Sequence, residues 1–295
     1  MTLSACLIFN GLTAPNTMAL DLSTLWDFKN PAASEQRFRD ALGTAQGDDA
    51  LILRTQMART LGLRGQFDNA RTLLAEMAPQ VTQAGAEARA RHALELGRTW
   101  ASAAHPPAAL TDAAKAQARA QFEAALATAR QAQLDALAID AIHMMAFVDT
   151  APADQLKWAQ AALEVSVASQ QPAARQWEAS VRNNLGYALH QLGRYPEALA
   201  QFELALALRE RGTDAVATRE ARWMIGWTLR SLQRLDEALA VQLRLERECA
   251  EAGQPDPYVF EELEALYQAK GDAVRAAHYA RRLKPQSSAG PSQAD

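Results

Sequence analysis

The residue types that most often carry catalysis or bind metal ions are poorly spaced for either role in this sequence. The five histidines lack the His-x3-His spacing that places two metal ligands on one helix face. Asp140 and His143 stand three residues apart and could form a ligand pair, although a polar pair on a helix surface is the simpler interpretation. There is no Gly-rich phosphate loop and no Gly-x-Ser-x-Gly elbow. We therefore expect a protein that is not an enzyme, with no cofactor and no bound metal.

The composition indicates the kind of element that must position any functional side chain. Alanine supplies 65 of the 295 residues, whereas glycine supplies 14 and proline 12. Alanine is the best helix former, and glycine and proline are the strongest helix breakers. The chain is therefore predicted to be all-α, which excludes a β-sandwich, a barrel, collagen and a disordered polar chain, and argues against a Rossmann or P-loop enzyme.

Charge and cysteine content limit the partners and the compartment. The net charge of −4 gives no general attraction to nucleic acid, and no basic arm precedes the helical region. The apolar run at 6–9 is too short to span a bilayer. Cys6 and Cys249 lie far apart and suggest neither a disulfide framework nor a zinc site. We expect a cytoplasmic protein that binds neither nucleic acid nor membranes.

A short motif recurs along the chain and reveals a repeat. Phe-x-x-Ala-Leu begins at Phe38, Phe122 and Phe202, at intervals of 84 and 80 residues, or about two units of 40 each. The three apolar residues of each copy share one helix face because they stand at i, i+3 and i+4. The intervals predict further units between the copies.

The clearest unit pairs two helices around a glycine turn. Leu185-Gly186 lies in the first helix, Gly193-x-Tyr195 at the turn, and Ala198 and Phe202 in the second helix. This pattern resembles the tetratricopeptide repeat. The resemblance implies an all-α, right-handed superhelical solenoid of antiparallel helix pairs with a concave channel.

The resemblance defines a domain plan. Six units begin near residues 51, 90, 136, 179, 219 and 257, about 41 residues apart, which is longer than the usual ~34 and typical of the extended members of the family. We expect one solenoid over 33–285, formed by a half unit and about six helix pairs. We expect a poorly structured leader over 1–32, in which Met18 is a more natural start than Met1. We expect a disordered tail over 286–295.

In this family the first helix of each unit lines the concave side, so the resemblance also implies a binding groove. The candidate partner-binding residues at the groove positions are Arg59, Arg91, Arg98, Asn183, Asn184, Tyr187, Trp223, Trp227, Arg230 and Glu261.

Asparagine and tryptophan side chains form the most suggestive part of this set. The carboxamides of Asn183 and Asn184 can bond both the N–H and the C=O of an extended peptide. The indoles of Trp223 and Trp227 offer large apolar surfaces and N–H donors. The alternative is that the two tryptophans, four residues apart, simply pack between helices.

The groove positions also differ in charge along the chain. Arginines gather in the N-terminal units (Arg59, Arg91, Arg98) and glutamates in the C-terminal units (Glu220, Glu261, Glu262). Such a gradient could orient a bound segment, and ordinary solvated helix faces would explain it as well.

One ligand of the family is excluded by this sequence. Chaperone-binding relatives hold a terminal carboxylate with a clamp in which Asn184 would take the middle position. Asp140 and Met144 stand before it and Glu220 and Met224 after it, where the clamp needs Lys or Asn and Lys or Arg. Two acidic residues would repel the carboxylate.

Two functions remain open. The first is a non-catalytic scaffold or adaptor that binds a protein or peptide in the groove. The second is a peptide-responsive sensor whose superhelix changes curvature when the ligand binds. The protein could be a monomer or a homodimer, because end repeats without polar caps expose apolar faces.

Overall fold

The computed structural model describes residues 20–283, and within this range the chain contains helices and connecting loops but no strand. The first half contains α1 (Pro31–Leu42), α2 (Gly47–Leu63), α3 (Phe67–Val81), α4 (Ala86–Arg98), α5 (Asp112–Gln131), α6 (Asp135–Met145) and α7 (Pro152–Ala168). The second half contains the short α8 (Pro172–Arg175), then α9 (Glu178–Gln191), α10 (Tyr195–Arg209), α11 (Ala215–Ser231), α12 (Leu235–Glu251), α13 (Pro257–Ala269) and α14 (Ala273–Leu283). Two 3-10 turns, Leu22–Thr24 and Pro107–Ala109, complete the set.

Left-handed residues end the first helix in four of the six pairs, those that begin with α2, α9, α11 and α13, and reverse the chain there. Gly193 has φ +73°, and the N–H of Arg194, the residue after it, donates to the carbonyl of Leu189 across 2.9 Å. This geometry closes the helix, and glycine adopts it without steric cost. In the next pair Gln233 occupies the same position with φ +61°. The turn is therefore preserved where the glycine is not.

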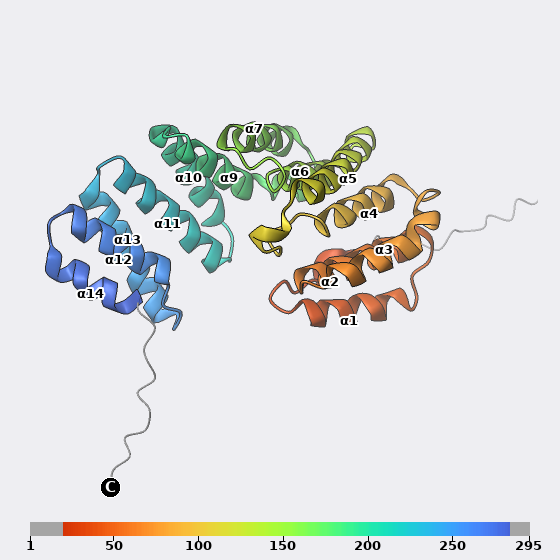
Figure 1. The fold of residues 1–295 in the computed structure, drawn as a ribbon, viewed down its shortest axis with the longest axis horizontal. Helices are drawn as coiled ribbons and strands as arrows, with labels where there is room; N and C mark the ends of the chain where they lie inside the picture. Colours follow the sequence, from red (N-terminus) through yellow and green to blue (C-terminus); the bar gives the residue numbers. More distant parts are fainter. Residues whose placement is uncertain (1–19, 284–295) are drawn as a thin grey trace, which may run out of the picture.

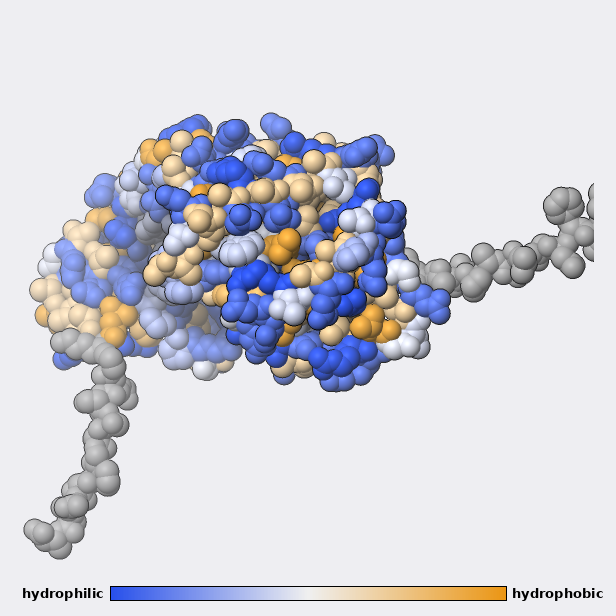
Figure 2. Space-filling view, turned by 45° about the vertical axis from the view of Figure 1, so that its right-hand side comes forward, coloured by the Kyte–Doolittle hydropathy of each residue, from blue (hydrophilic) through white to orange (hydrophobic). Residues whose placement is uncertain are grey.

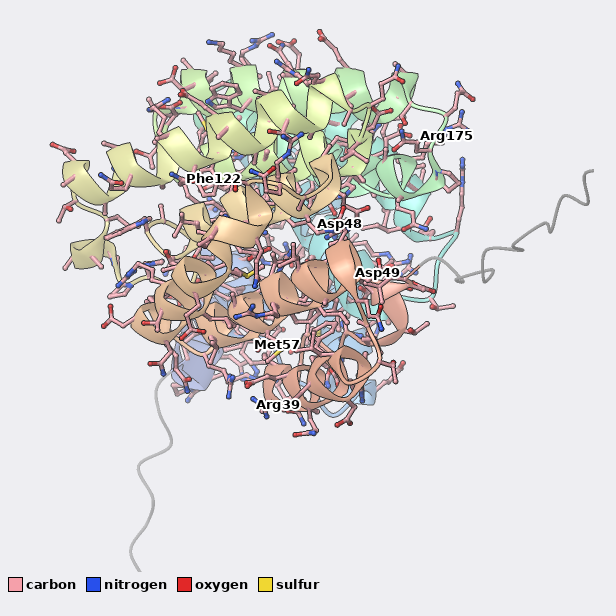
Figure 3. All side chains as sticks on the ribbon, turned by 90° about the vertical axis from the view of Figure 1, so that its right-hand side faces the viewer. Arg39, Asp48, Asp49, Met57, Phe122 and Arg175 are labelled. Carbon is pink, nitrogen blue, oxygen red and sulfur yellow. The ribbon has the colours of Figure 1, made fainter. Side chains whose placement is uncertain are left out.

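A phenylalanine ring on the second helix of a pair packs against a glycine on the first helix. A Cβ added at Gly97 would stand 2.4 Å from the ring of Phe122, and one added at Gly186 would stand 2.7 Å from the ring of Phe202. Both phenylalanines are fully buried, and Phe122 is labelled in Figure 3. The repeated Phe-x-x-Ala-Leu motif thus fixes the close approach of paired helices.

The pairs stack side by side into an arch, with α1 at one end and α14 at the other (Figure 1). Hydrogen bonds and ion pairs join each first helix to the next: α2 to α4, α4 to α6, α6 to α9, α9 to α11 and α11 to α13. These six helices therefore form one continuous row. The predicted all-α solenoid of antiparallel helix pairs is confirmed.

The segment before α1 differs from the expectation of a poorly structured leader over 1–32. Trp26 Nε1 donates to Gln56 Oε1 of α2 across 3.1 Å, and the Trp26 ring stacks on Phe28 with 4.5 Å between centroids. Both rings lie within 6 Å of the Arg59 guanidinium. The expectation was wrong for residues 20–32, because aromatic packing holds a segment that lacks helical periodicity. The expected start at Met18 and the expected tail at 286–295 lie outside the described residues.

The long connection between α4 and α5, residues 99–111, folds back on the solenoid. The His105 ring stacks on Phe67 with 3.7 Å between centroids. One ring nitrogen of His105 contacts the Ser102 hydroxyl at 2.9 Å and the other the Thr99 carbonyl at 3.1 Å. The insertion is therefore a fixed part of the surface that the first helices line.

Candidate functional site

Three cavities follow the row of first helices. The N-terminal cavity, of about 220 Å³, lies among α2, α4 and α6. The central cavity, of about 340 Å³, lies among α6, α7 and α9. The C-terminal cavity, of about 560 Å³, lies among α9, α11, α12 and the start of α13. The first two share His143 and Phe147, and neighbouring residues of α9 line the second and third.

The C-terminal cavity combines apolar walls with one unsatisfied polar group. Trp223, Met224 and Val259 contribute to its walls. Asn183 also lines it, and the side-chain oxygen of Asn183 is buried without a hydrogen-bond partner in the described part of the chain. A buried carbonyl oxygen without a donor costs about 1–3 kcal/mol. The fold therefore leaves this acceptor unused beside the cavity.

A row of aromatic rings crosses from α9 to α13 beside this cavity. Trp227 stacks on His190 with 3.4 Å between centroids and on Trp223 with 5.7 Å. The Trp223 indole N–H donates to the backbone carbonyl of Tyr258 across 3.1 Å. Trp223 lines the cavity, and Trp227 stacks against α9 through His190.

Asn184 lines the central cavity and, unlike the oxygen of Asn183, its side-chain amide is hydrogen-bonded within the protein. Asn184 Nδ2 donates to Nδ1 of His143 on α6 across 3.1 Å. Trp158 of α7 and Leu110, from the 99–111 insertion, form apolar parts of the cavity wall. Tyr187 also lines this cavity, and 39% of its surface is exposed. Asn184 therefore joins two repeat units in the free protein, and a ligand would have to share or replace that bond.

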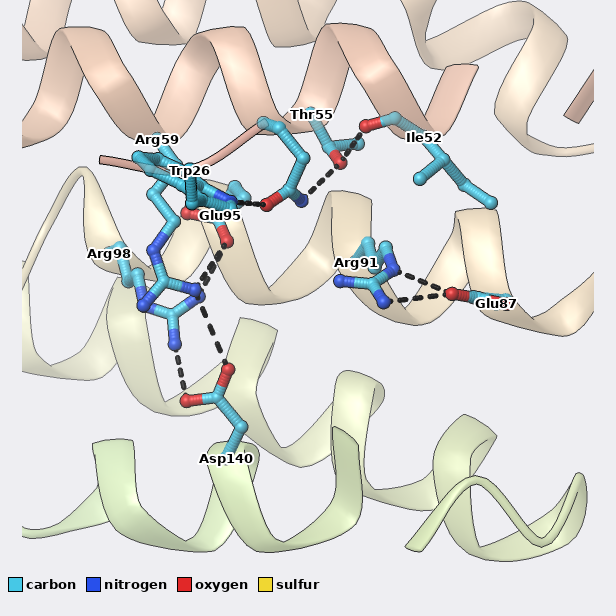
Figure 4. A network of polar contacts seen from close by, with 10 residues as sticks. Trp26, Ile52, Thr55, Arg59, Glu87, Arg91, Glu95, Arg98 and Asp140 are labelled. Atoms are coloured by element: carbon cyan, nitrogen blue, oxygen red, sulfur yellow. Dashed lines mark hydrogen bonds and ion pairs between the residues drawn. The ribbon is translucent and has the colours of Figure 1, made fainter. Parts of the chain in front are cut away.

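Ion pairs form the floor of the N-terminal cavity (Figure 4). Arg98 bridges Glu95, at 2.5 Å, and Asp140. Arg59 lies farther from the same two carboxylates, at 3.7 and 3.8 Å. Glu95 and Asp140 are both buried, so this cluster links α2, α4 and α6 inside the protein.

Burial and charge act in opposite directions on the ionisable groups of this cluster. Burial alone would lower the pKa of Arg98 and raise that of Asp140, but their mutual attraction outweighs it, so the pKa of Arg98 is raised and that of Asp140 lowered. Burial and the neighbouring Arg98 charge lower the pKa of Arg59. Burial also lowers the pKa of His143, which keeps the ring neutral and able to accept from Asn184.

The charge gradient expected along the groove is largely neutralised within the protein. Arg91 pairs with Glu87 at 2.8 Å and lines none of the three cavities. Arg230 binds the buried Glu262 through two contacts of 2.7 Å. Arg230 and Glu262 sit on different helices, α11 and α13, which the sequence alone could not place together. Glu261 is exposed and stands away from the three cavities.

Several lining residues were missed from the sequence. Ala103, Ala104 and Leu110 reach the cavities from the 99–111 insertion between α4 and α5. Trp177 lines the N-terminal cavity from the residue before α9. Loop residues follow no helical period, so the repeat pattern could not assign them to the groove.

Figure 2 shows a face on which hydrophilic residues surround small hydrophobic clusters. Among residues 20–283, no three His, Cys, Asp or Glu side chains are grouped as metal ligands would be. No helix in that range is long and apolar enough to cross a membrane.

Comparison with known proteins supports the repeat assignment. The tetratricopeptide repeat family matches residues 177–245. None of the curated proteins is similar enough in sequence to count as a match. The apo form of RapI superposes with a TM-score of 0.66 at 13% identity, covering 89% of this chain and 74% of that one.

Two further structures have the same arrangement of helices. Pseudomonas aeruginosa pilF gives a TM-score of 0.56 at 18% identity, covering 81% of this chain and 93% of that one. A Rap protein complexed with competence and sporulation factor gives a TM-score of 0.56 at 12% identity, covering 88% of this chain and 73% of that one. Similarity at these identities shows a shared fold. Residues 20–283 form a helical-repeat solenoid, within which residues 177–245 match the tetratricopeptide repeat.

Proposed function

We propose that this protein is a non-catalytic scaffold that binds an extended segment of a partner protein or peptide along the central and C-terminal cavities. The observation that carries the proposal is the buried, unpaired side-chain oxygen of Asn183 beside the apolar C-terminal cavity. A peptide N–H would satisfy that oxygen, and an apolar side chain of the same segment would fill the cavity beside Trp223.

The shape of the site supports a segment longer than one residue. Two cavities of about 340 and 560 Å³ flank the Asn183–Asn184 pair, so neighbouring side chains of an extended ligand could enter one cavity each. Apolar pockets with a few convergent polar groups are typical of binding sites. Cys249 lines the C-terminal cavity, but burial raises the pKa of its thiol, which disfavours the reactive thiolate. We place the protein in the cytoplasm, where such a thiol stays reduced.

A peptide-responsive sensor is the second candidate. The Rap protein with the same fold is complexed with competence and sporulation factor. In this chain Asn184 holds α9 to α6 through His143, so a ligand that takes over the Asn184 amide would release one contact between repeat units. The angle between the two halves of the arch would then depend on the ligand.

Partner capture from native cells, followed by affinity measurement, tests the scaffold proposal. The partner is identified by mass spectrometry, and its binding is then titrated with purified protein and variants. Asn183→Ala is expected to weaken binding by about tenfold, which corresponds to about 1.4 kcal/mol for one buried hydrogen bond. Asn69→Ala is the matched control, because Asn69 is exposed on α3, away from the three cavities. Equal affinities of the two variants would refute the site.

Small-angle scattering separates the two candidates. A sensor would bind a short synthetic peptide and change its radius of gyration on saturation. A scaffold would bind the peptide with its radius of gyration unchanged.

A further inference from the structure

The N-terminal cavity is lined by hydrogen-bonding groups that have no role in the proposed groove. It lies beyond the central cavity, among α2, α4 and α6, and none of its lining residues belongs to the C-terminal cavity. Its floor is the ion-pair cluster, and its apolar wall includes Leu63, Met144, Phe147 and Trp177.

Arg59 brings unused hydrogen-bond donors to this floor. Its guanidinium stands 3.7 Å from the nearest oxygen of Glu95 and 3.8 Å from that of Asp140, beyond hydrogen-bond distance. Arg98 makes the closer contacts to both carboxylates. Within residues 20–283, Arg59 is held by ion pairing and by the Trp26 and Phe28 rings rather than by hydrogen bonds. Its N–H groups can therefore donate to a ligand oxygen.

Glu95 lines the same cavity and has an unused acceptor. Its side chain is 3% exposed, and Oε1 takes the contacts with Arg98 and Arg59. Oε2 is buried without a hydrogen-bond partner among the described residues. A buried carboxylate oxygen in this state needs a donor, because the lost hydration is not replaced.

The charges of the cluster select the kind of ligand group. Two arginines and two carboxylates sum to zero, and His143 beside them is kept neutral by burial. A charged ligand would therefore leave a net charge inside a largely apolar cavity, which is costly. A neutral group that both accepts from Arg59 and donates to Glu95 meets both requirements.

We propose that the N-terminal cavity is a second binding site, which takes a carboxamide group on a short apolar stem, with its C=O on Arg59 and its N–H on Glu95. A glutamine side chain or a peptide's terminal amide has this chemistry. The cavity volume of about 220 Å³ fits one such group, with the stem against Phe147 and Trp177.

The 99–111 insertion forms part of the wall of this site. Ala103 and Ala104 form part of the cavity wall, and both are exposed loop residues. The stacked and hydrogen-bonded His105 holds this wall in place. A larger side chain at position 104 can therefore block the cavity without disturbing a helix.

Three small probes with matched stems test the proposal: pentanamide, pentanoate and pentylamine. Binding is measured by protein-observed NMR titration of the full chain at pH 7. Pentanamide is expected to bind about tenfold more tightly than either charged probe, the difference expected for one buried hydrogen bond. Tighter binding of pentanoate or pentylamine, or no binding of pentanamide, would overturn the proposal.

Variants place the binding at the cavity. Arg59→Met is expected to weaken pentanamide binding about tenfold, since it removes the donors but keeps the stem. Arg91→Met is the matched control, because Arg91 pairs with Glu87 outside the cavity. Ala104→Leu, in the loop, is expected to abolish binding even if Arg59→Met fails to fold. Full binding by Ala104→Leu would contradict the assignment.

This proposal does not depend on the groove proposal, and the two can fail separately. Asn183→Ala removes the unpaired oxygen of the C-terminal cavity and is expected to leave pentanamide binding unchanged. A loss of pentanamide binding in Asn183→Ala would place the amide in the C-terminal cavity and overturn the second site.

Discussion

At the scale of single residues, Gln242 is a buried polar side chain at a packing position where two other helix pairs have phenylalanine. It packs against Gly226 in the pair α11–α12, as Phe122 packs against Gly97 and Phe202 against Gly186. Gln242 is fully buried, and its side-chain oxygen has no hydrogen-bond partner among residues 20–283. The fifth pair therefore carries a polar group where two other pairs carry a ring.

Replacing this glutamine with leucine should stabilise the protein. Gln242→Leu keeps nearly the same volume and removes a buried, half-satisfied amide, so the free energy of unfolding is expected to rise by about 1 kcal/mol. Urea denaturation followed by circular dichroism measures the change. Gln268→Leu, at an exposed position on α13, is the control and should change stability by less than about 0.5 kcal/mol. A fall in stability for Gln242→Leu would show that the amide is satisfied in solution.

At the scale of elements, the helix pairs could be predicted because their determinants are local. Gly193 and the Leu185-Gly186 step specify a turn and a close contact within 20 residues of sequence. The contents of the candidate site could be predicted less well. Arg59 and Arg98 were assigned to the groove as its positive end, but Glu95 on α4 and Asp140 on α6 neutralise them. Pairing across repeat units depends on how helices stack, which a repeat pattern does not reveal.

The segment around Trp26 and the 99–111 insertion were missed for a related reason. Both are fixed by a few individual side-chain contacts, Trp26 with Gln56 and Phe38, and His105 with Phe67, rather than by a periodic apolar face. A pattern search finds faces that recur, so it passes over segments that a few individual contacts hold in place.

The turn between α11 and α12 gives a test at this scale. Gln233 has φ +61°, a left-handed conformation that costs a residue with a Cβ roughly 1–2 kcal/mol. Gln233→Gly should relieve that cost and raise the free energy of unfolding by about 1 kcal/mol, allowing for the greater freedom of glycine in the unfolded chain. The reverse change, Gly193→Gln in the preceding pair, should destabilise the protein by a similar amount. Thermal unfolding of both variants measures the effect, and shifts of the same sign would refute the account.

At the scale of the whole molecule, polar contacts between successive first helices hold the arch together. Two of these contacts use neutral histidines: His143 with Asn184, and His190 with Ser231. Burial, with a smaller contribution from Arg230, lowers the pKa of His190 to about 4, and burial lowers that of His143. The arch should therefore depend on pH through groups near its centre.

Mild acid should destabilise the protein. The unfolded chain takes up protons on these histidines near the ordinary pKa of about 6.5, whereas the folded chain resists protonation until lower pH. The stabilisation is complete above pH 6.5 and is lost as the pH falls towards 4. The melting temperature is expected to fall between pH 7.5 and pH 5, and to fall less steeply in His190→Gln, which does not titrate. Parallel profiles for the two proteins would show that His190 contributes nothing to the pH dependence.

The central claim is that the row of first helices, and not the opposite side of the arch, contacts the partner. Site-specific photo-crosslinking in native cells tests it most directly, with benzoylphenylalanine replacing one residue at a time. Tyr187 on α9 and Leu204 on α10 are both partly exposed, at 39% and 46%, so the two sites are matched in access. The account predicts a crosslinked partner from position 187 and none from position 204. A partner crosslinked only from position 204 would contradict it.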